Sequence, residues 1–346
     1  MLRGITRRPW WPWTLRIATA AFLALVAWLL VRQARTVDWA AVWRTMLGLP
    51  APVLLAAGGL ALCSHLLYAS FDLFGRRASG HRLSVPTTLG ITLVSYPFTL
   101  NLGSLIGGVA TRYRLYSRHG LDHGQIGQIV GTSMLTNWVG YFVLAGIAFW
   151  LWTPRLPEGW QVGPAQLHAA GVALAAVSAG YLALCALRRA PLSVRGHEFP
   201  LPTWPLALLQ IALSALNWAL MSGMVWLLLQ RQAPYPAVLA TMLFGAVAGL
   251  VSRVPAGLGV LEAVAVGLLA ATAPRDAVLA AILAYRALYY FAPLVLAALA
   301  FAAIELRWRK ANPPDAGGRP GSEGADGARH CAAPAPAPGA RRVGAA

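Results

Sequence analysis

Charged residues are the scarcest class in this sequence, and their scarcity excludes a soluble protein. Only 11% of the 346 residues are Asp, Glu, Lys or Arg, whereas 58% are hydrophobic. The mean hydropathy is +0.59. Soluble domains carry about a quarter charged residues and about half apolar ones. The composition therefore predicts a polytopic membrane protein.

Acidic residues and cysteines are also few, which limits the chemistry that the chain can perform. Eleven Asp and Glu residues, several of them near the C-terminus, leave little material for general acid–base catalysis. The three cysteines have no C-x-x-C spacing and indicate neither a disulfide framework nor a metal cluster. His119 and His123 lack the glutamate of an H-E-x-x-H site, and no G-x-S-x-G motif occurs. We expect no enzyme activity, no metal and no cofactor.

Positive charge is the one abundant charge, with 28 Lys and Arg residues and a formal net charge of +17. No groove-reading motif accompanies these residues, so nucleic acid is not an expected partner. Most of them flank hydrophobic runs, where arginine sets topology and contacts anionic headgroups. By the positive-inside rule both termini are cytoplasmic, as are the basic clusters: Arg3, Arg7 and Arg8; Arg76, Arg77, His81 and Arg82; Arg112, Arg114 and Arg118; Arg188, Arg189 and Arg195; Arg307, Arg309 and Lys310.

Eight hydrophobic segments approach the ~20-residue length that a bilayer demands. Two of them, Pro86–Val109 and Ala237–Ala273, are interrupted by glycine and proline. The other six are regular and are predicted to cross the membrane: Leu15–Val31, Pro52–Gly75, Ile126–Trp152, Leu167–Leu187, Leu206–Leu229 and Val278–Ile304.

The side on which the flanking spans and basic clusters lie decides whether each broken segment crosses the membrane. Cytoplasmic basic clusters flank the first broken segment at both ends, so it enters from the cytoplasm and turns back. The second lies between a span that ends outside and a last span that must end inside, so it enters from the outer face and turns back. We predict an all-α polytopic fold with six full transmembrane helices and two oppositely oriented re-entrant helical hairpins, as in inverted-repeat transporters. Eight full spans is the alternative. The predicted domains are a basic cytoplasmic N-terminus, residues 1–14; a membrane domain, 15–306; and a disordered cytoplasmic tail, 307–346.

The second broken segment holds polar and turn-forming residues within "SRVPAGLGVLEA". Pro255 interrupts the helix, and Gly257 and Gly259 permit a turn, so this stretch is the predicted hairpin tip. Irregular backbone at membrane depth must be buried in protein or line a water-filled cavity. Arg253 and Glu262 lie on opposite arms, where they either pair to lock the tip or bind a ligand.

The first broken segment has a glycine-rich tip with Asn101, Gly103 and Gly107. The spacing of the two glycines, G-x-x-x-G, lets helix backbones approach closely. Arg112 and Arg114 follow on the returning arm beside tyrosines. A guanidinium group binds phosphate bidentately, so Arg112, which is nearest the tip, is the leading phosphate ligand. The alternative is that these arginines snorkel to the inner surface.

The last span carries "YRALYY", in which Arg286 and Tyr290 share one helix face. An arginine this deep requires a partner, for which Glu262, a lipid phosphate or Asp72 is available. For Asp72 a local i,i+4 pair with Arg76 is the favoured interpretation. Three further polar residues within spans are predicted to form hydrogen bonds between helices: His65, Asn137 and Asn217.

Three ordered motifs, "NLGSLIGGVATRYRLY", "RVPAGLGVLEA" and "AYRALYYFAPLVLAAL", resemble the membrane domain of the lysylphosphatidylglycerol synthase/flippase family. The resemblance covers Arg16 to Leu306. It implies a lipid-flipping function and a headgroup cavity lined at matching positions by Arg112, Arg253, Glu262 and Arg286. The longest members add a cytosolic aminoacyl-transferase domain. We expect none here, because the predicted tail is too short to fold one.

These observations predict a flippase-like lipid translocase of the bacterial inner membrane, with Glu262 as the candidate for proton coupling. The expected partners are membrane lipids: an anionic phospholipid, lysyl-phosphatidylglycerol, a hopanoid or a glycolipid. A second copy of the chain or a separate lipid-modifying enzyme is a further partner class. The alternatives are a non-catalytic scaffold for such an enzyme, or an integral glycosyl or aminoacyl transferase.

Overall fold

The computed structural model describes residues 39–152, 163–188, 192–194, 197–199, 201–252, 254 and 257–311. The predicted first span, Leu15–Val31, lies outside these residues, as do most of the predicted tail and two predicted site residues, Arg253 and Pro255. The chain divides into two compact units, Met1–Phe301 and Ala302–Ala346. The contacts described below belong to the first unit.

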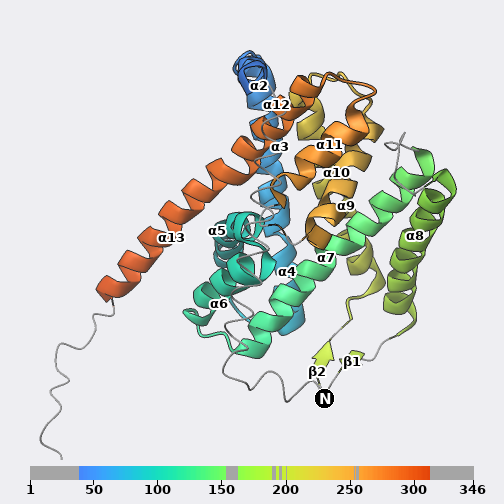
Figure 1. The fold of residues 1–346 in the computed structure, drawn as a ribbon. Helices are drawn as coiled ribbons and strands as arrows, with labels where there is room; N and C mark the ends of the chain where they lie inside the picture. The colour runs from blue at the N-terminus through green and yellow to red at the C-terminus, as the bar shows by residue number, and fades with distance from the viewer. Residues whose placement is uncertain are drawn as a thin grey trace, which may run out of the picture. The chain divides into compact units, whose positions relative to one another are not determined.

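Helices make up nearly all of the described structure (Figure 1). In chain order the elements are α2 (Trp39–Leu47), α3 (Ala51–Ala69), α4 (Phe71–Ser79), α5 (Val85–Leu102), the π-helical η2 (Ser104–Val109), α6 (Ala110–Ser117), α7 (His123–Leu151), α8 (Pro164–Leu187), the strands β1 (Leu192–Val194) and β2 (His197–Phe199), α9 (Trp204–Leu228), α10 (Tyr235–Ser252), α11 (Val260–Leu269), α12 (Arg275–Arg286), the π-helical η4 (Ala287–Phe291) and α13 (Ala292–Ala311). Strands β1 and β2 form one small antiparallel pair.

The all-α membrane fold predicted from the sequence is confirmed. Among the described residues, six helical stretches are long and apolar enough to cross a membrane: Ala51–Ser79, His123–Leu151, Ala165–Leu187, Trp204–Leu228, Tyr235–Ser252 and Arg275–Trp308. Five of them correspond to predicted full spans. The sixth, Tyr235–Ser252, is the first arm of the second broken segment, so re-entry of this segment stays a prediction.

The helix starts follow local sequence rules. α7 begins with a capping box, in which Asp122 Oδ1 accepts from the Gln125 backbone N–H at 2.9 Å and Gln125 Oε1 accepts from the Asp122 N–H at 3.3 Å. Ser84 caps the start of α5, because its hydroxyl accepts from the Thr87 N–H. Proline occupies the first turn of α3, α5, α8 and α9, where its missing N–H is not needed.

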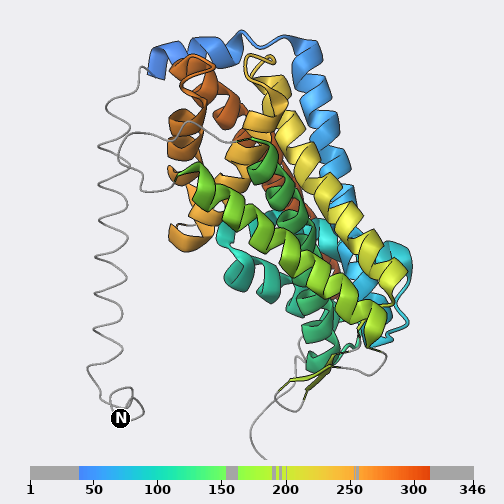
Figure 2. The same cartoon turned by 90° about the vertical axis from the view of Figure 1, so that its right-hand side faces the viewer.

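The long helices pack around α7, which contacts α4, α8, α9 and α10. α3 runs alongside α9 and also contacts α5 (Figures 1 and 2). Close approach is possible where glycine removes the side chain. A Cβ added at Gly140 of α7 would lie 2.3 Å from the Ser214 Cβ of α9. These contacts bring the polar residues of distant segments into one interior.

Both broken segments fold back on themselves. α5 ends at Gly103 (φ +82°) and packs against η2, while α10 packs against α11 after a turn with Gly257 (φ +58°) and Gly259 (φ +78°). Such φ angles favour glycine. In the first hairpin a Cβ at Gly107 would lie 2.0 Å from the Phe98 carbonyl oxygen. The hairpins lie toward opposite ends of the first unit, α5 and α6 below and α10 and α11 above in Figure 1.

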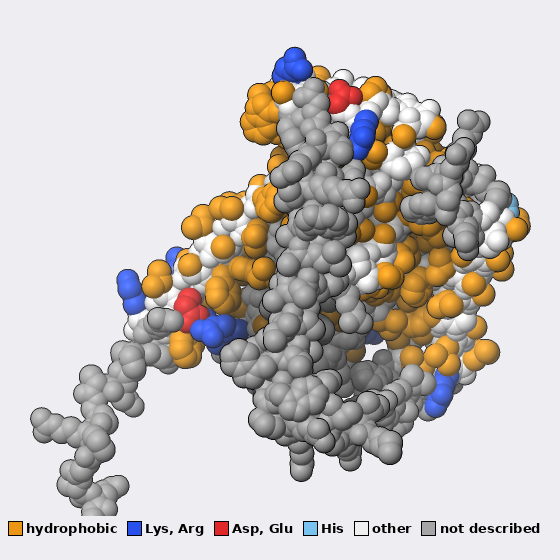
Figure 3. Space-filling view, in the orientation of Figure 1, with side chains coloured by type: hydrophobic (Ala, Val, Ile, Leu, Met, Phe, Trp, Pro, Cys, Tyr) orange, Lys and Arg blue, Asp and Glu red, His pale blue; other side chains and the backbone are white. Residues whose placement is uncertain are grey.

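The outer surface of the helices is apolar. Figure 3 shows hydrophobic side chains across the visible flanks, with few Lys and Arg side chains among them. Several large apolar residues are strongly exposed, among them Leu55, Leu62, Leu187, Leu216 and Val251. Such a surface suits lipid, in which exposed leucine and valine side chains carry no hydration cost.

Candidate functional site

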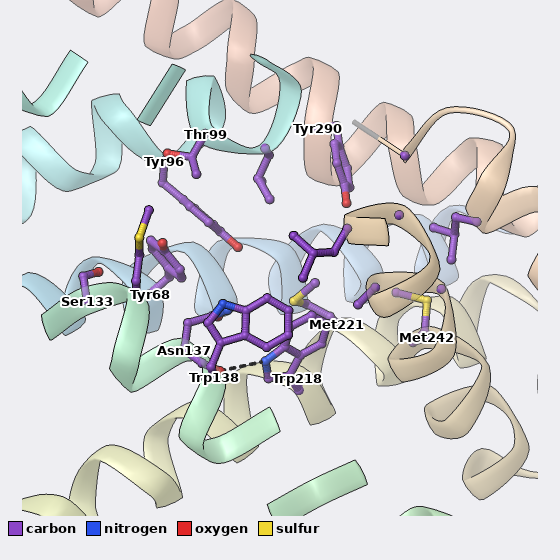
Figure 4. A pocket seen from close by; sticks show the side chains of 18 of the residues that line it. Tyr68, Tyr96, Thr99, Ser133, Asn137, Trp138, Trp218, Met221, Met242 and Tyr290 are labelled. Carbon is purple, nitrogen blue, oxygen red and sulfur yellow. Dashed lines mark hydrogen bonds between the residues drawn. The ribbon is translucent and has the colours of Figure 1, made fainter. Parts of the chain in front are cut away.

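A cavity of about 330 Å³ lies inside the first unit, where the two hairpins meet α3, α7, α9, α12 and η4 (Figure 4). Its wall is rich in aromatic and methionine side chains: Tyr68, Tyr96, Trp138, Trp218, Tyr285, Tyr290, Met134, Met221 and Met242. Its polar side chains are few and include Thr99, Arg112, Ser133 and Asn137. A mostly apolar pocket with a few convergent polar groups is the usual form of a ligand site.

The two tryptophans of the wall are held in place by α7. Figure 4 shows Trp138 and Trp218 close to Asn137, with Tyr96 and Tyr290 reaching in from the other side. The Trp218 indole N–H donates to the Asn137 carbonyl oxygen at 3.2 Å, and the Ser214 hydroxyl donates to the same oxygen at 2.8 Å. The link between α7 and α9 at Asn137 thus uses its backbone oxygen and not the side-chain amide that was predicted to form it, and that side chain lines the cavity.

A buried ion pair holds the returning arm of the first hairpin. Arg112 of α6 donates to both carboxylate oxygens of Asp72 in α4, at 3.0 and 3.2 Å, and the Tyr116 hydroxyl donates to Asp72 at 3.0 Å. The two charged side chains are 3% and 0% exposed. The Arg112 guanidinium carbon also lies 5.9 Å from the centre of the Tyr68 ring, a cation–π distance.

The prediction that Asp72 pairs locally with Arg76 is wrong. Arg76 Nε instead donates to the Leu83 carbonyl oxygen at 2.7 Å. Asp72 is fully buried, and a buried carboxylate needs several donors with good geometry. A guanidinium fork and a hydroxyl from the facing helix α6 supply them, so the non-local partner is preferred over the half-buried arginine one turn away.

A second ion pair holds the returning arm of the second hairpin. Arg286, at the end of α12, donates from Nε to Glu262 Oε1 in α11 and from Nη2 to Glu262 Oε2 at 3.1 Å. Nη2 also donates to the Gly257 carbonyl oxygen at 2.9 Å. Of the partners considered for Arg286, the structure selects Glu262. The arginine thereby ties α12 both to the returning arm, through Glu262, and to the hairpin tip, through Gly257.

The two pairs occupy equivalent places in the two hairpins. Each joins the returning arm to a helix outside the hairpin, α6 to α4 and α11 to α12. In each pair the arginine lies near a cavity-lining tyrosine: Arg112 near Tyr68, and Arg286 near Tyr290, whose ring centre is 5.4 Å from its guanidinium carbon. Each pair thus attaches one hairpin to its surroundings beside the cavity wall.

The remaining predicted site residues lie farther from the cavity. Asn101 donates to the Pro97 and Tyr290 carbonyl oxygens at 2.9 and 3.2 Å, so it joins the first hairpin to η4 and is not part of the lining. Arg114 is exposed on α6 and is also outside the lining. Of the predicted substrate-binding side chains that the structure describes, which leaves out Arg253, only Arg112 and Tyr290 line the cavity directly, together with the tip residue Gly257.

A buried chain of hydroxyl groups beside the cavity was not predicted. The Ser64 hydroxyl donates to Asn217 Oδ1 at 2.6 Å and lies 2.7 Å from the Tyr289 hydroxyl, which lies 3.0 Å from the Tyr96 hydroxyl. Asn217 thus joins α9 to α3, as predicted for helix-to-helix bonding. His65 does not follow that prediction, because its Nδ1 pairs with the Ala61 carbonyl of its own helix. Tyrosines in the middle of apolar segments were the available signal.

Comparisons with known proteins agree with this architecture. Residues 14–297 match the family described as "Lysylphosphatidylglycerol synthase TM region". The "Inner membrane protein YbhN" of Escherichia coli is 39% identical over 304 residues, which cover 87% of this chain and 96% of that protein. The "Uncharacterized protein slr0712" of Synechocystis is 31% identical over 271 residues, 78% of this chain and 84% of that protein.

Proposed function

Because this chain belongs to the lysylphosphatidylglycerol synthase transmembrane-region family, we propose that it is a flippase-like lipid translocase of the bacterial inner membrane. The observation that carries the proposal is the cavity between the two hairpins, which combines an aromatic wall with a buried arginine. Both termini would be cytoplasmic by the positive-inside rule. The protein would act without covalent chemistry.

The chemistry of the cavity favours a phospholipid headgroup as cargo. The aromatic faces of Trp138 and Trp218 would attract an ammonium group, and Arg112 would receive the phosphate. The phosphate would compete with Asp72 for the guanidinium, so entry of the headgroup would weaken the clamp on the first hairpin. The acyl chains would remain in the bilayer against the apolar outer surface.

Movement of the headgroup between leaflets would then follow from alternate release of the two hairpins. A headgroup at Arg112 loosens the contact of α6 with α4, and protonation of Glu262 loosens the contact of α11 with α12. The hairpins lie toward opposite ends of the first unit, so each release would open the cavity toward a different leaflet. Glu262 would couple the second release to the proton gradient.

Lipid scrambling in liposomes tests the proposal. Purified protein is reconstituted with fluorescent phosphatidylethanolamine, phosphatidylglycerol or lysyl-phosphatidylglycerol, and the fraction reduced by external dithionite is followed with and without a pH gradient. The wild type should move at least one of these lipids faster than protein-free liposomes. Liposomes in which none of the three moves under any gradient would refute translocation.

Two matched variants test whether the lipid headgroup passes through the central cavity. Asn137→Leu keeps the number and branching of the side-chain heavy atoms but removes the amide from the cavity wall, and it should slow transport about tenfold because a polar headgroup loses a hydrogen-bonding partner. Gly90→Leu adds the same apolar side chain at an exposed position of α5, where a Cβ meets no atom within 4 Å. This control should transport like the wild type. Equal rates for both variants would place the path elsewhere.

A further inference from the structure

A second cavity, of about 390 Å³, lies between α4, α7, α8 and the start of α9. It lies against the face of α7 that is opposite to the face lining the central cavity. Gln128, Gly131 and Leu135 line it, whereas Val130 and Asn137 line the central one. Helix α7 therefore separates the two cavities, and a ligand in the second would not stand in the translocation path.

The inner wall of the second cavity carries polar side chains that already form hydrogen bonds with one another. The Tyr181 hydroxyl donates to Gln210 Oε1 at 2.8 Å, and Gln210 Nε2 donates to the Thr136 hydroxyl at 2.8 Å. The Thr136 hydroxyl in turn donates to the Thr132 carbonyl oxygen at 2.8 Å. Gln210 is only 1% exposed. This network joins α7, α8 and α9 and pairs these polar groups with one another.

The mouth of the cavity carries a positive charge. Arg77 lines it, is exposed, and has no ion pair or hydrogen bond within the described part of the chain. It follows Arg76 and precedes Arg82 in a basic cluster that the positive-inside rule places on the cytoplasmic side. Beside it the wall is apolar, with Phe74 and Leu135, so one end of a ligand would meet a cation and the rest would meet hydrocarbon.

We propose that this cavity is a binding site for one anionic phospholipid of the cytoplasmic leaflet, separate from the transport cavity. The phosphate lies at Arg77, and one acyl chain lies along α7 past Gly131. A Cβ added at Gly131 would meet no other atom within 4 Å, so there is open space beside this glycine for the lipid acyl chain. Charge complementarity selects an anionic lipid, because a cation at this depth faces the negative surface of the inner leaflet.

Native mass spectrometry of the purified protein in detergent tests the site without any transport measurement. The protein is titrated with phosphatidylglycerol and with phosphatidylcholine of the same acyl chains, and the singly lipid-bound fraction is measured. Both lipids carry a phosphate, but the choline ammonium of phosphatidylcholine cancels its charge and is repelled by Arg77, so the wild type should bind one phosphatidylglycerol about tenfold more tightly than phosphatidylcholine. A wild type without this preference would overturn the proposal.

Two variants with matched controls assign the binding to this cavity. Arg77→Gln should abolish the preference for phosphatidylglycerol and Arg77→Lys should keep part of it, while Arg82→Gln, an equal charge change outside the cavity, should not alter it. Gly131→Leu fills the cavity and should lower binding of both lipids, whereas Gly90→Leu should not. Each variant is first checked for a monodisperse elution profile.

The outcomes separate this site from the proposed function. Unchanged binding in Gly131→Leu would overturn the site even if the protein moves lipid between leaflets. Selective loss of phosphatidylglycerol binding in Arg77→Gln would support the site even if no lipid is translocated, because binding in detergent does not require transport.

Discussion

The contact between Asp72 and Arg112 should be one of the most strongly coupled pairs in the protein. Two hydrogen bonds of 3.0 and 3.2 Å join side chains that are 0% and 3% exposed. Removing one partner of such a pair costs roughly 3–5 kcal/mol, because the remaining charge keeps its desolvation penalty without a counter-charge. Asp72→Asn and Arg112→Gln should each lower the free energy of unfolding by about that amount.

The double variant decides whether the charges interact as the structure indicates. Asp72→Asn with Arg112→Gln leaves two neutral amides in the same space, so its loss should be smaller than the sum of the single losses by about 2–3 kcal/mol. Unfolding is followed by tryptophan fluorescence in one detergent. Arg82→Gln, an exposed loop position, is the control and should change stability by less than about 0.5 kcal/mol. Additive losses in the double variant would refute the reasoning.

The same set of two single variants and one double variant, made at Glu262 and Arg286, allows the coupling energies of the two pairs to be compared. Glu262 is 16% exposed, whereas Asp72 is fully buried. Water screens the more exposed carboxylate and solvates it when its partner is removed, so Glu262→Gln and Arg286→Gln should show a smaller coupling. A larger coupling at this pair would contradict the ranking by burial.

Two further predictions concern the first hairpin and the loop that precedes it. Gly107→Ala should prevent normal closure of the hairpin, because its Cβ would lie 2.0 Å from the Phe98 carbonyl oxygen, whereas Gly90→Ala should be neutral or slightly stabilising in thermal unfolding; equal melting temperatures would contradict this. Burial lowers the pKa of His81 below 6.5, and its Nδ1 accepts from the Leu83 N–H at 3.2 Å. Since the folded pKa is the lower one, this contribution to stability is present above pH 6.5 and is lost as the pH falls through the folded pKa; His81→Asn should flatten the dependence of the melting temperature on pH between 7.5 and 5.

Much of the fold follows from local properties of the sequence. Composition and segment length predict an all-α membrane protein, because only helices satisfy every backbone group within one segment in lipid. The hairpin tips were predictable for a similar reason. Gly103, Gly257 and Gly259 adopt positive φ angles that other residues rarely take, so the glycines mark the turns before any partner is known. The sequence also indicated that Arg286 needs a counter-charge, because this arginine lies in the middle of a long apolar segment.

The choice of partners required the tertiary structure. The sequence offered Asp72 a neighbour one turn away, yet the helix rotation directs it toward Arg112, which is 40 residues distant. The Ser64–Asn217 bond spans 153 residues. The cavity depends in the same way on the close packing of α7 against α9, which brings together tryptophans 80 residues apart in sequence numbering, Trp138 and Trp218. Length, composition and turn chemistry are set within a segment, whereas the rotation and depth of each helix are set only when all segments pack together.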